Sequence, residues 1–139
     1  MSNSAAATVK RFMELIQDRA TLREGLSMVS ADFVGTEPAG VPYGGEYRGD
    51  TAFLDLLRAV GKHVSMRVHD LNVHDLDETV SRTGIQRALA EITADMVHLS
   101  TGETYPLRAL EIYSVRDGQI CGLEVFYNDS KSAGEFMLN

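Results

Sequence analysis

The chain has 139 residues, of which 44% are hydrophobic and 24% charged, as in one soluble globular domain and unlike disordered or fibrous proteins. Asp and Glu outnumber Lys and Arg by 20 to 13, a formal net charge of −7, and because this charge repels phosphate backbones and anionic lipid, we expect neither a nucleic-acid nor a membrane partner. The single Cys121 cannot form an internal disulfide, and the sequence lacks a secretory signal and the ~18 apolar residues of a membrane span, so we expect a cytoplasmic protein.

Three helices are predicted in the first 62 residues by apolar side chains that recur every three or four positions. The first spans residues 5–18. The second begins at Thr21, which together with Glu24 matches the S/T-x-x-E capping box. The third ends at Gly61 and takes Asp50 as its N-terminal cap.

A glycine-rich segment, residues 32–49, lies between the second and third helices and holds two of the three prolines. Glycine and proline interrupt regular structure, so we expect a long ordered loop or a broken strand there. The helical spacing ends after residue 62. Residues 63–76 contain several valines and are predicted to form a strand.

A β-hairpin is predicted at the C-terminal end of the chain. Residues 105–116 and 119–128 are rich in Tyr, Ile, Val and Phe, and Asp117 and Gly118 separate them. An Asp-Gly pair between two such runs favours a two-residue hairpin turn. The sequence therefore predicts two antiparallel strands joined at this turn.

Residues 88–98 fit two structures. Ile85, Leu89, Ile92 and Met96 have helical spacing, whereas the turn signals on either side favour a strand. Helices in the first part of the chain and strands in the second nevertheless indicate one α+β domain.

The order of these elements resembles the SnoaL-like branch of the nuclear-transport-factor-2-like superfamily. The resemblance rests on residues 41–49 (VPYGGEYRG), which lead into residues 50–58, and on the turn at 115–120 followed by Val-Phe-Tyr at 125–127. It covers about residues 8–129. Residues 1–139 are therefore expected to form a single SnoaL-like domain with a C-terminal tail at 130–139.

The resemblance implies a cone-shaped α+β barrel, in which N-terminal helices pack on a strongly curved antiparallel sheet that encloses a pocket. It makes residues 88–98 a strand, and it implies a homodimer formed through the curved sheet. Leu110, Ile112, Leu123 and Phe126 support the dimer because they put apolar side chains on both faces of the C-terminal hairpin. Members of the superfamily include cyclases, isomerases, hydrolases, dehydratases and proteins without catalytic activity, so the fold does not fix the function.

Glu37 is the first candidate catalytic residue. Pro38 forces the residue before it into an extended conformation, and ketosteroid isomerases, which this segment resembles, have an Asp-Pro pair here whose carboxylate is the general base. An apolar pocket would raise the pKa of Glu37 and suit it to removing a proton next to a carbonyl. The alternative is a solvated loop residue.

Glu111 is the second candidate. Strand alternation puts it on the face of Leu107, Ala109 and Tyr113. It matches the position where the isomerases hold a protonated Asp that donates a hydrogen bond to the oxyanion. In the alternative, Leu110 faces the core and Glu111 faces water.

Several positions depart from the catalytic sets of the superfamily. Phe12 stands where the isomerases have their oxyanion-hole tyrosine, which makes steroid isomerase activity improbable. Val125 stands where the resembling polyketide cyclases have an acidic residue. Arg108 lies on the opposite strand face from Glu111, which disfavours the Asp-Arg-Asp set of the epoxide hydrolases.

A set of aromatic, sulfur and imidazole side chains is expected to line the pocket and bind the ligand: Phe12, Tyr43, Tyr47, Met96, His98, Tyr113 and Tyr127. The alternative for each is a place in the core. We expect no metal site, because His69 and His74 point to opposite strand faces and a third ligand is lacking. The glycines between residues 40 and 49 match no nucleotide-binding loop, and no cofactor is expected.

Two functions fit these residues. In the first, a cofactor-free isomerase, cyclase or dehydratase uses Glu37 as base and Glu111 or a tyrosine as acid on a hydrophobic, oxygenated substrate. In the second, the protein binds a small hydrophobic molecule without catalysis, or acts as a dimeric interaction module. An apolar pocket serves both.

Overall fold

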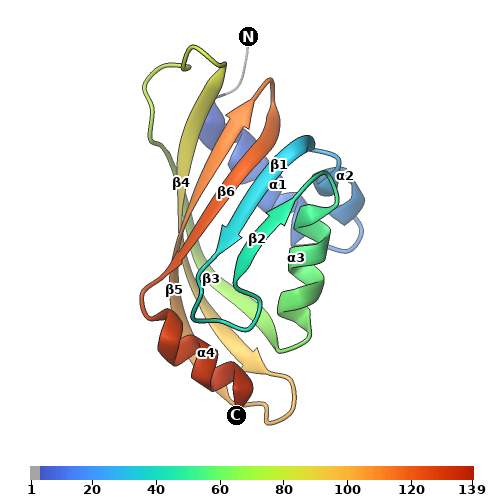
Figure 1. Cartoon of the computed structure of the whole chain (residues 1–139), viewed down its shortest axis with the longest axis vertical. Helices are drawn as coiled ribbons and strands as arrows, with labels where there is room; N and C mark the ends of the chain where they lie inside the picture. The colour runs from blue at the N-terminus through green and yellow to red at the C-terminus, as the bar shows by residue number, and fades with distance from the viewer. Residues whose placement is uncertain (1–3) are drawn as a thin grey trace.

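A computed structural model describes residues 4–139 of the chain. The elements in chain order are α1 (Ala5–Ile16), α2 (Leu22–Leu26), β1 (Val29–Glu37), β2 (Gly45–Arg48), α3 (Ala52–Gly61), β3 (Val64–Asp75), β4 (Ile85–His98), β5 (Thr104–Arg116), β6 (Gln119–Tyr127) and α4 (Ser130–Leu138) (Figure 1). Helices α1, α2 and α3 precede the long strands β3 to β6, as the sequence predicts, and α4 follows them. The α+β class is confirmed.

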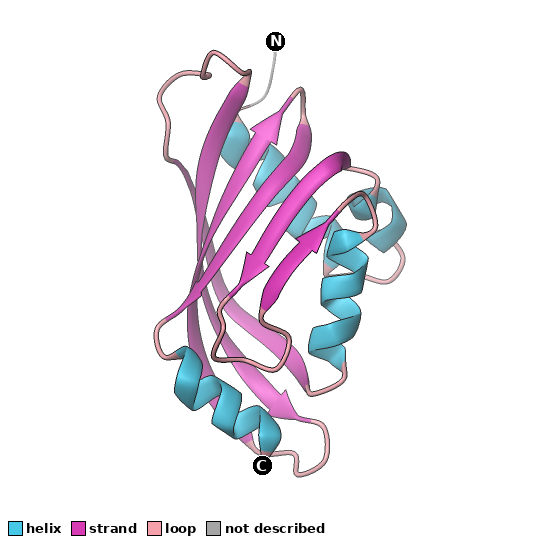
Figure 2. Ribbon diagram, viewed as in Figure 1, coloured by secondary structure: helices cyan, strands magenta, loops and turns pink. Residues whose placement is uncertain are grey.

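The six strands form one sheet in the order β2-β1-β6-β5-β4-β3 (Figure 2). Four neighbouring pairs are antiparallel, but β1 runs parallel to β6. The sheet is thus mixed, where a purely antiparallel sheet was expected. It also stays open, because β2 and β3 are its two edges and do not pair with each other.

The position of α3 shows that the sheet is strongly curved. This helix packs against β1 and against both edge strands, β2 and β3. One helix can contact both edges only if the sheet curls around it. Helix α1 packs against β3, β4 and β5 and lies behind the strands in the view of Figure 1. The two helices thus share the concave face, which confirms the cone-like fold.

An aromatic cluster joins these helices to the sheet. Phe12 of α1 meets Phe53 of α3 edge to face, with ring centroids 4.9 Å apart, and Tyr113 of β5 at 6.1 Å. Phe33 of β1 meets Phe53 from the other side at 6.2 Å. Each edge-to-face pair adds to the apolar burial that stabilises the core.

The hairpin predicted between β5 and β6 is confirmed. Asp117 and Gly118 both have positive φ, 53° and 74°, as the favoured two-residue turn requires. The ambiguous segment 88–98 belongs to β4, one continuous strand that pairs with β3 and β5 along its length. Pairing on both sides overrides its helical spacing.

The glycine-rich segment is more regular than expected. It contributes the second half of β1 and all of β2, which pair antiparallel with Val34 opposite Arg48 and Glu37 opposite Gly45. Only the connection between the two strands is a loop. Cross-strand hydrogen bonds, which local composition does not report, hold Gly35 and residues 46–48 in extended structure.

Neither predicted cap makes its side-chain hydrogen bond, although Thr21 does stand at the N-cap position of α2. The Thr21 hydroxyl donates to the Leu15 carbonyl oxygen at 2.7 Å and caps nothing, and α2 is a single short turn. Helix α3 begins after Thr51, one residue beyond Asp50, without a side-chain cap. A hydroxyl that finds a partner in the preceding helix is lost to its own helix.

The N-terminus of α1 is instead capped from the sheet. The Ala5 N–H donates to Gln86 Oε1 at 2.9 Å, and the Ala6 N–H donates to Asp75 Oδ1 at 2.8 Å. Ser4 Oγ accepts from the Ala7 N–H at 3.2 Å. Side chains from β3 and β4 thus satisfy donors that the first turn of a helix leaves unpaired.

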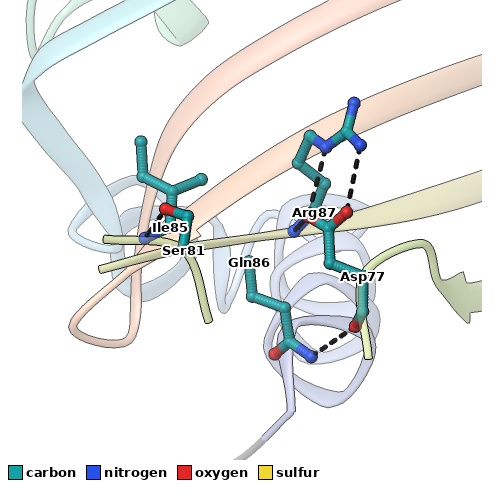
Figure 3. Close-up of polar contacts among 5 residues, drawn as sticks. All are labelled: Asp77, Ser81, Ile85, Gln86 and Arg87. Carbon is teal, nitrogen blue, oxygen red and sulfur yellow. Dashed lines mark hydrogen bonds and ion pairs between the residues drawn. The ribbon is translucent and has the colours of Figure 1, made fainter. Parts of the chain in front are cut away.

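A polar cluster between β3 and β4 holds this anchor in place (Figure 3). Gln86 Nε2 donates to the Asp77 carbonyl oxygen at 2.9 Å, which orients the amide for its bond to α1. The Arg87 guanidinium donates hydrogen bonds to both carboxylate oxygens of Asp77, at 3.0 and 3.1 Å. The Ile85 N–H donates to Ser81 Oγ at 3.1 Å, across the loop that joins β3 to β4.

Residues 130–139, expected to be a tail, form helix α4. Asp129 caps it by accepting from the Ser132 N–H at 3.0 Å. The helix packs so closely on the loop after β1 that a Cβ atom on Gly134 would lie 1.9 Å from the Gly40 carbonyl oxygen. Among residues 4–139, no helix combines the length and apolarity that crossing a membrane requires.

Candidate functional site

A cavity of about 310 Å³ lies on the concave side of the sheet, bounded by α1, α3 and the five strands β1, β3, β4, β5 and β6. Most of its lining is apolar. Met13 and Ile16 come from α1, and Phe53, Leu56, Leu57 and Val60 come from α3. Its volume is at the lower end of the ~300–1,000 Å³ typical of ligand pockets.

Glu37 and Glu111 both line this cavity. Glu111 of β5 pairs with Val125 of β6, and Thr36 of β1 pairs with Glu124 on the other side of β6. One residue further along the parallel strands brings Glu37 beside Val125. The two acids therefore flank Val125, with backbones about 10 Å apart, two strand spacings.

Glu37 is held in dry surroundings. The residue is 9% exposed, and its Oε2 is buried without a hydrogen-bond partner. Burial, followed by repulsion from Glu111, raises its pKa to about 9, although the neighbouring Tyr127 hydroxyl opposes the shift. A neutral carboxyl avoids most of the penalty of an unpaired buried charge, so Glu37 is protonated at neutral pH.

Glu111 has a partner that favours its charged form. The Tyr113 hydroxyl donates to Glu111 Oε1 at 2.9 Å. Burial raises the pKa of Glu111 to about 7, and this hydrogen bond limits the shift. Around neutral pH the cavity thus contains one protonated carboxyl, Glu37, and a second carboxyl, Glu111, that is partly ionised.

The tyrosines divide into two groups. Tyr113 and Tyr127 line the cavity, whereas Tyr43 and Tyr47 lie behind Tyr127. The Tyr43 and Tyr127 hydroxyls are 2.5 Å apart, and the Tyr47 hydroxyl donates to the Tyr43 carbonyl oxygen at 2.7 Å. Burial raises the pKa of Tyr43, Tyr113 and Tyr127, which keeps their hydroxyls protonated.

The remaining three expected binding residues do not line the cavity. Phe12 and Met96 are fully buried in the core. His98 lies at the end of β4, where Nδ1 accepts from the N–H groups of Ser100 at 3.1 Å and Thr101 at 3.3 Å. These bonds place the proton on Nε2, which is buried without a hydrogen-bond partner among the described residues, and the ring packs edge to face against Phe136 of α4. They give His98 a role in the turn after β4.

The apolar wall of the cavity was missed from sequence. Met13, Phe53 and Leu56 belong to helical stripes that the spacing assigns to the core, and they are indeed buried. The sequence did contain a signal for it. Small strand residues such as Ala94 and Ala109 leave space between the curved sheet and the two apolar helix stripes that face it.

Arg108 lies on the outer face of the sheet, as expected, in a second hollow of about 420 Å³. Leu110 and Phe126 line this hollow, stand opposite each other, and are 46% and 49% exposed. The hollow contains neither Glu37 nor Glu111. In residues 4–139, the structure brings no three His, Cys, Asp or Glu side chains together as a metal site.

Comparisons with known proteins agree with this architecture. The family model of the SnoaL-like domain matches residues 9–123. A nuclear-transport-factor-2-like protein of unknown function from Burkholderia pseudomallei is 20% identical, with a TM-score of 0.79 and 100% of both chains covered. A proposed polyketide cyclase from Xanthomonas campestris is 23% identical, with a TM-score of 0.73, covering 96% of this chain and 94% of that one.

A third similar structure is TerC co-crystallised with polyporic acid, which is 20% identical with a TM-score of 0.69 and covers 92% of this chain and 98% of that one. The curated proteins contain no match to the sequence. At these identities the solved structures share a fold with this chain. The family model spans most of the sequence, and the chain therefore belongs to the SnoaL-like domain family.

Proposed function

We propose that the cavity binds a small hydrophobic, oxygenated molecule and that Glu37 and Glu111 perform acid–base chemistry on it. The reaction class is isomerisation, cyclisation or dehydration, in which a proton leaves one atom of the substrate and another is delivered elsewhere. The observation that carries the proposal is the pair of carboxyl side chains from separate strands in one apolar cavity. Perturbed carboxyls in a cavity are typical of catalytic sites.

The electrostatics favour roles opposite to those expected from sequence. Glu37, with a pKa near 9, is the proton donor, and Glu111, with a pKa near 7, is the base. Tyr113 positions Glu111 through its hydrogen bond of 2.9 Å. A base with a pKa close to the working pH combines a useful fraction of the ionised form with enough basicity to accept a proton.

In the simplest sequence of events, ionised Glu111 removes a proton from the carbon next to a carbonyl of the substrate. Glu37 donates a hydrogen bond or its proton to the carbonyl oxygen as negative charge develops there. The proton held by Glu111 then returns at a second atom, and Glu37 recovers its own. Protons balance within the pair, so the cycle requires only these residues and the substrate.

Two similar structures support a small organic ligand. TerC was co-crystallised with polyporic acid, and the Xanthomonas protein is a proposed polyketide cyclase. Both statements belong to those proteins. They make carbonyl compounds with aromatic or extended apolar bodies the first molecules to try.

Deuterium exchange tests the proposal before a physiological substrate is known. A panel of aryl ketones and β-keto esters is incubated in D₂O, and exchange at the carbon next to the carbonyl is followed by proton NMR. We expect Glu111→Gln to slow enzyme-dependent exchange by ~10²–10⁴-fold, the usual contribution of a general base. Asp117→Asn, a change in the distant β5–β6 turn, is the control. Equal exchange by wild type and Glu111→Gln would exclude Glu111 as the base.

A non-catalytic binding protein is the second candidate. Phe12 is the observation that favours it, because it provides no hydroxyl and is buried in the core beside Tyr113. In that case ligands bind in the cavity, and wild-type exchange stays at the background rate for the whole panel.

A further inference from the structure

The cavity has a polar end and an apolar end. Its deep end contains Glu37, Glu111, Tyr113 and Tyr127, all on neighbouring strands β1, β6 and β5. Tyr113 is 1% exposed there. A ligand that enters the cavity therefore meets its hydrogen-bonding groups last.

The apolar end is the entrance. Met66 and Val68 of the edge strand β3 line the cavity and are 37% and 39% exposed. Ile16 at the end of α1 and Val60 near the end of α3 line it as well. The apolar body of a ligand would be buried among these side chains, and the polar side chain at this end is that of Gln17, which follows Ile16.

The lining has acidic groups and no basic ones. Among the described residues that line the cavity, none is Lys, Arg or His, and Glu37 and Glu111 are the ionisable carboxyls. An anionic group at the deep end would approach Glu111 without a counter-charge in low-dielectric surroundings. Like charges placed together in this way disfavour binding.

Glu37 has a carboxyl oxygen that no group of residues 4–139 hydrogen-bonds. Glu111 already accepts from Tyr113, and the Tyr127 hydroxyl is paired with Tyr43. The Glu37 side chain lines the cavity, yet its Oε2 has no partner in the protein. A protonated carboxyl can offer its O–H to an acceptor atom that a ligand brings.

We infer that the cavity selects ligands by charge, taking a neutral molecule with a carbonyl-type oxygen that enters oxygen first and docks between Glu37 and Glu111, and excluding ionised carboxylic acids of the same shape. This inference deepens the proposed function, since it concerns the same cavity. It gives a ketone or an ester, and excludes the corresponding free acid, as the ligand class.

A cationic ligand is less well served than a neutral one. An ammonium group would have to lose its water at the closed end of an apolar cavity, where the available carboxylate, Glu111, is already hydrogen-bonded. Desolvation of two charges offsets most of the attraction between them. A carbonyl oxygen avoids this penalty and matches the O–H donor of Glu37.

Three naphthalene probes of similar size test the inference: 2-acetylnaphthalene, 2-naphthoate and the ammonium form of 2-(aminomethyl)naphthalene. Binding is measured at pH 7.5 by NMR of protein labelled at its methionine methyl groups. Met13 and Met66 line the cavity and report on it, whereas Met28 is packed elsewhere and serves as the internal control. We expect the ketone to shift the first two signals and to bind at least about tenfold more tightly than either charged probe, the effect of one well-made hydrogen bond.

Variants assign the selectivity to the two acids. Glu37→Leu removes the donor and should weaken ketone binding about tenfold, whereas Glu37→Gln keeps an N–H donor and should weaken it less. Glu111→Gln removes the charge and should narrow the gap between naphthoate and the ketone. Leucine in place of a buried unpaired carboxyl does not endanger folding, which thermal unfolding verifies.

Two results overturn the inference: a charged probe that binds as tightly as the ketone, or a ketone that leaves the Met13 and Met66 signals unchanged up to its solubility limit. Neither result depends on turnover. If the ketone binds selectively but no carbonyl compound exchanges its proton, the acid–base proposal fails and the ligand class stands. If exchange occurs and charged compounds bind equally well, the acid–base proposal stands and the proposed ligand class fails.

Discussion

Replacing Gly134 with alanine should separate α4 from the loop that follows β1. Within a helix, alanine is favoured over glycine by about 1 kcal/mol, so helix propensity alone predicts a more stable protein. The tertiary contact predicts the opposite. A Cβ atom at this position would lie 1.9 Å from the Gly40 carbonyl oxygen, where ordinary contacts begin at 3.4 Å.

The size of the effect follows from that clash. The backbone of the loop or of α4 must give way by about 3.4 − 1.9 = 1.5 Å, because both colliding groups are held by main chain. Such overpacking costs typically ~1–3 kcal/mol, more than the propensity gain at its upper end. Ala133 and Met137, buried on the same side of α4, would lose contacts as the helix moves. We expect a net loss of ~1–2 kcal/mol in the free energy of unfolding.

Urea denaturation followed by circular dichroism measures the change. Gly61→Ala is the matched control, since Gly61 is also helical and a Cβ there meets nothing within 4 Å. The control should be stabilised by up to ~1 kcal/mol. A Gly134→Ala protein as stable as the control, with α4 still docked, would refute the reasoning. The loop also positions Tyr43, whose hydroxyl contacts Tyr127, so displacement of α4 should weaken ligand binding too.

Three further predictions concern the helix anchor, the buried acid and the outer face. Gln86→Ala removes one of the three side chains that cap α1 and should lower the free energy of unfolding by ~1 kcal/mol, measured by urea denaturation beside the exposed control Glu78→Ala. Burial raises the pKa of Glu37 from 4.5 to about 9, so the folded state binds this proton more tightly than the unfolded state. The stabilisation that this proton gives the folded state is complete below pH 4.5 and is lost as the pH rises towards 9. Wild type should therefore lose more stability than Glu37→Gln across that interval. Equal losses would show that the carboxyl titrates at its ordinary pKa. We propose that a second copy of the chain covers the outer face, so wild type should sediment above the monomer mass of 15.3 kDa and Leu110→Glu should sediment at it; a monomeric wild type would contradict this.

Local patterns were sufficient where the interactions that form an element lie close together in the sequence. The spacing of apolar residues located α1 and α3 to within two residues at each end. Asp117 and Gly118 fixed the last hairpin, since the turn needs two residues that accept positive φ. These elements depend on neighbours a few positions away.

Local patterns left other elements open, or predicted them wrongly, because their partners are distant in the sequence. The sequence of β4 fits a helix until β3 and β5 pair with it, and β2 becomes a strand through its hydrogen bonds to β1. Thr21 resembles a cap, but its hydroxyl is used by Leu15 of the preceding helix region. In each case a tertiary partner competes with the local preference.

The candidate site shows the same division. The sequence by itself determined which residues are acids, that Pro38 extends the chain at Glu37, and that Glu111 shares a strand face with Tyr113. Only the tertiary structure decided that the two acids flank Val125, because that requires β1 to run parallel to β6. It also decided which carboxyl keeps its proton, since the pKa depends on burial and on neighbouring groups that come from other strands.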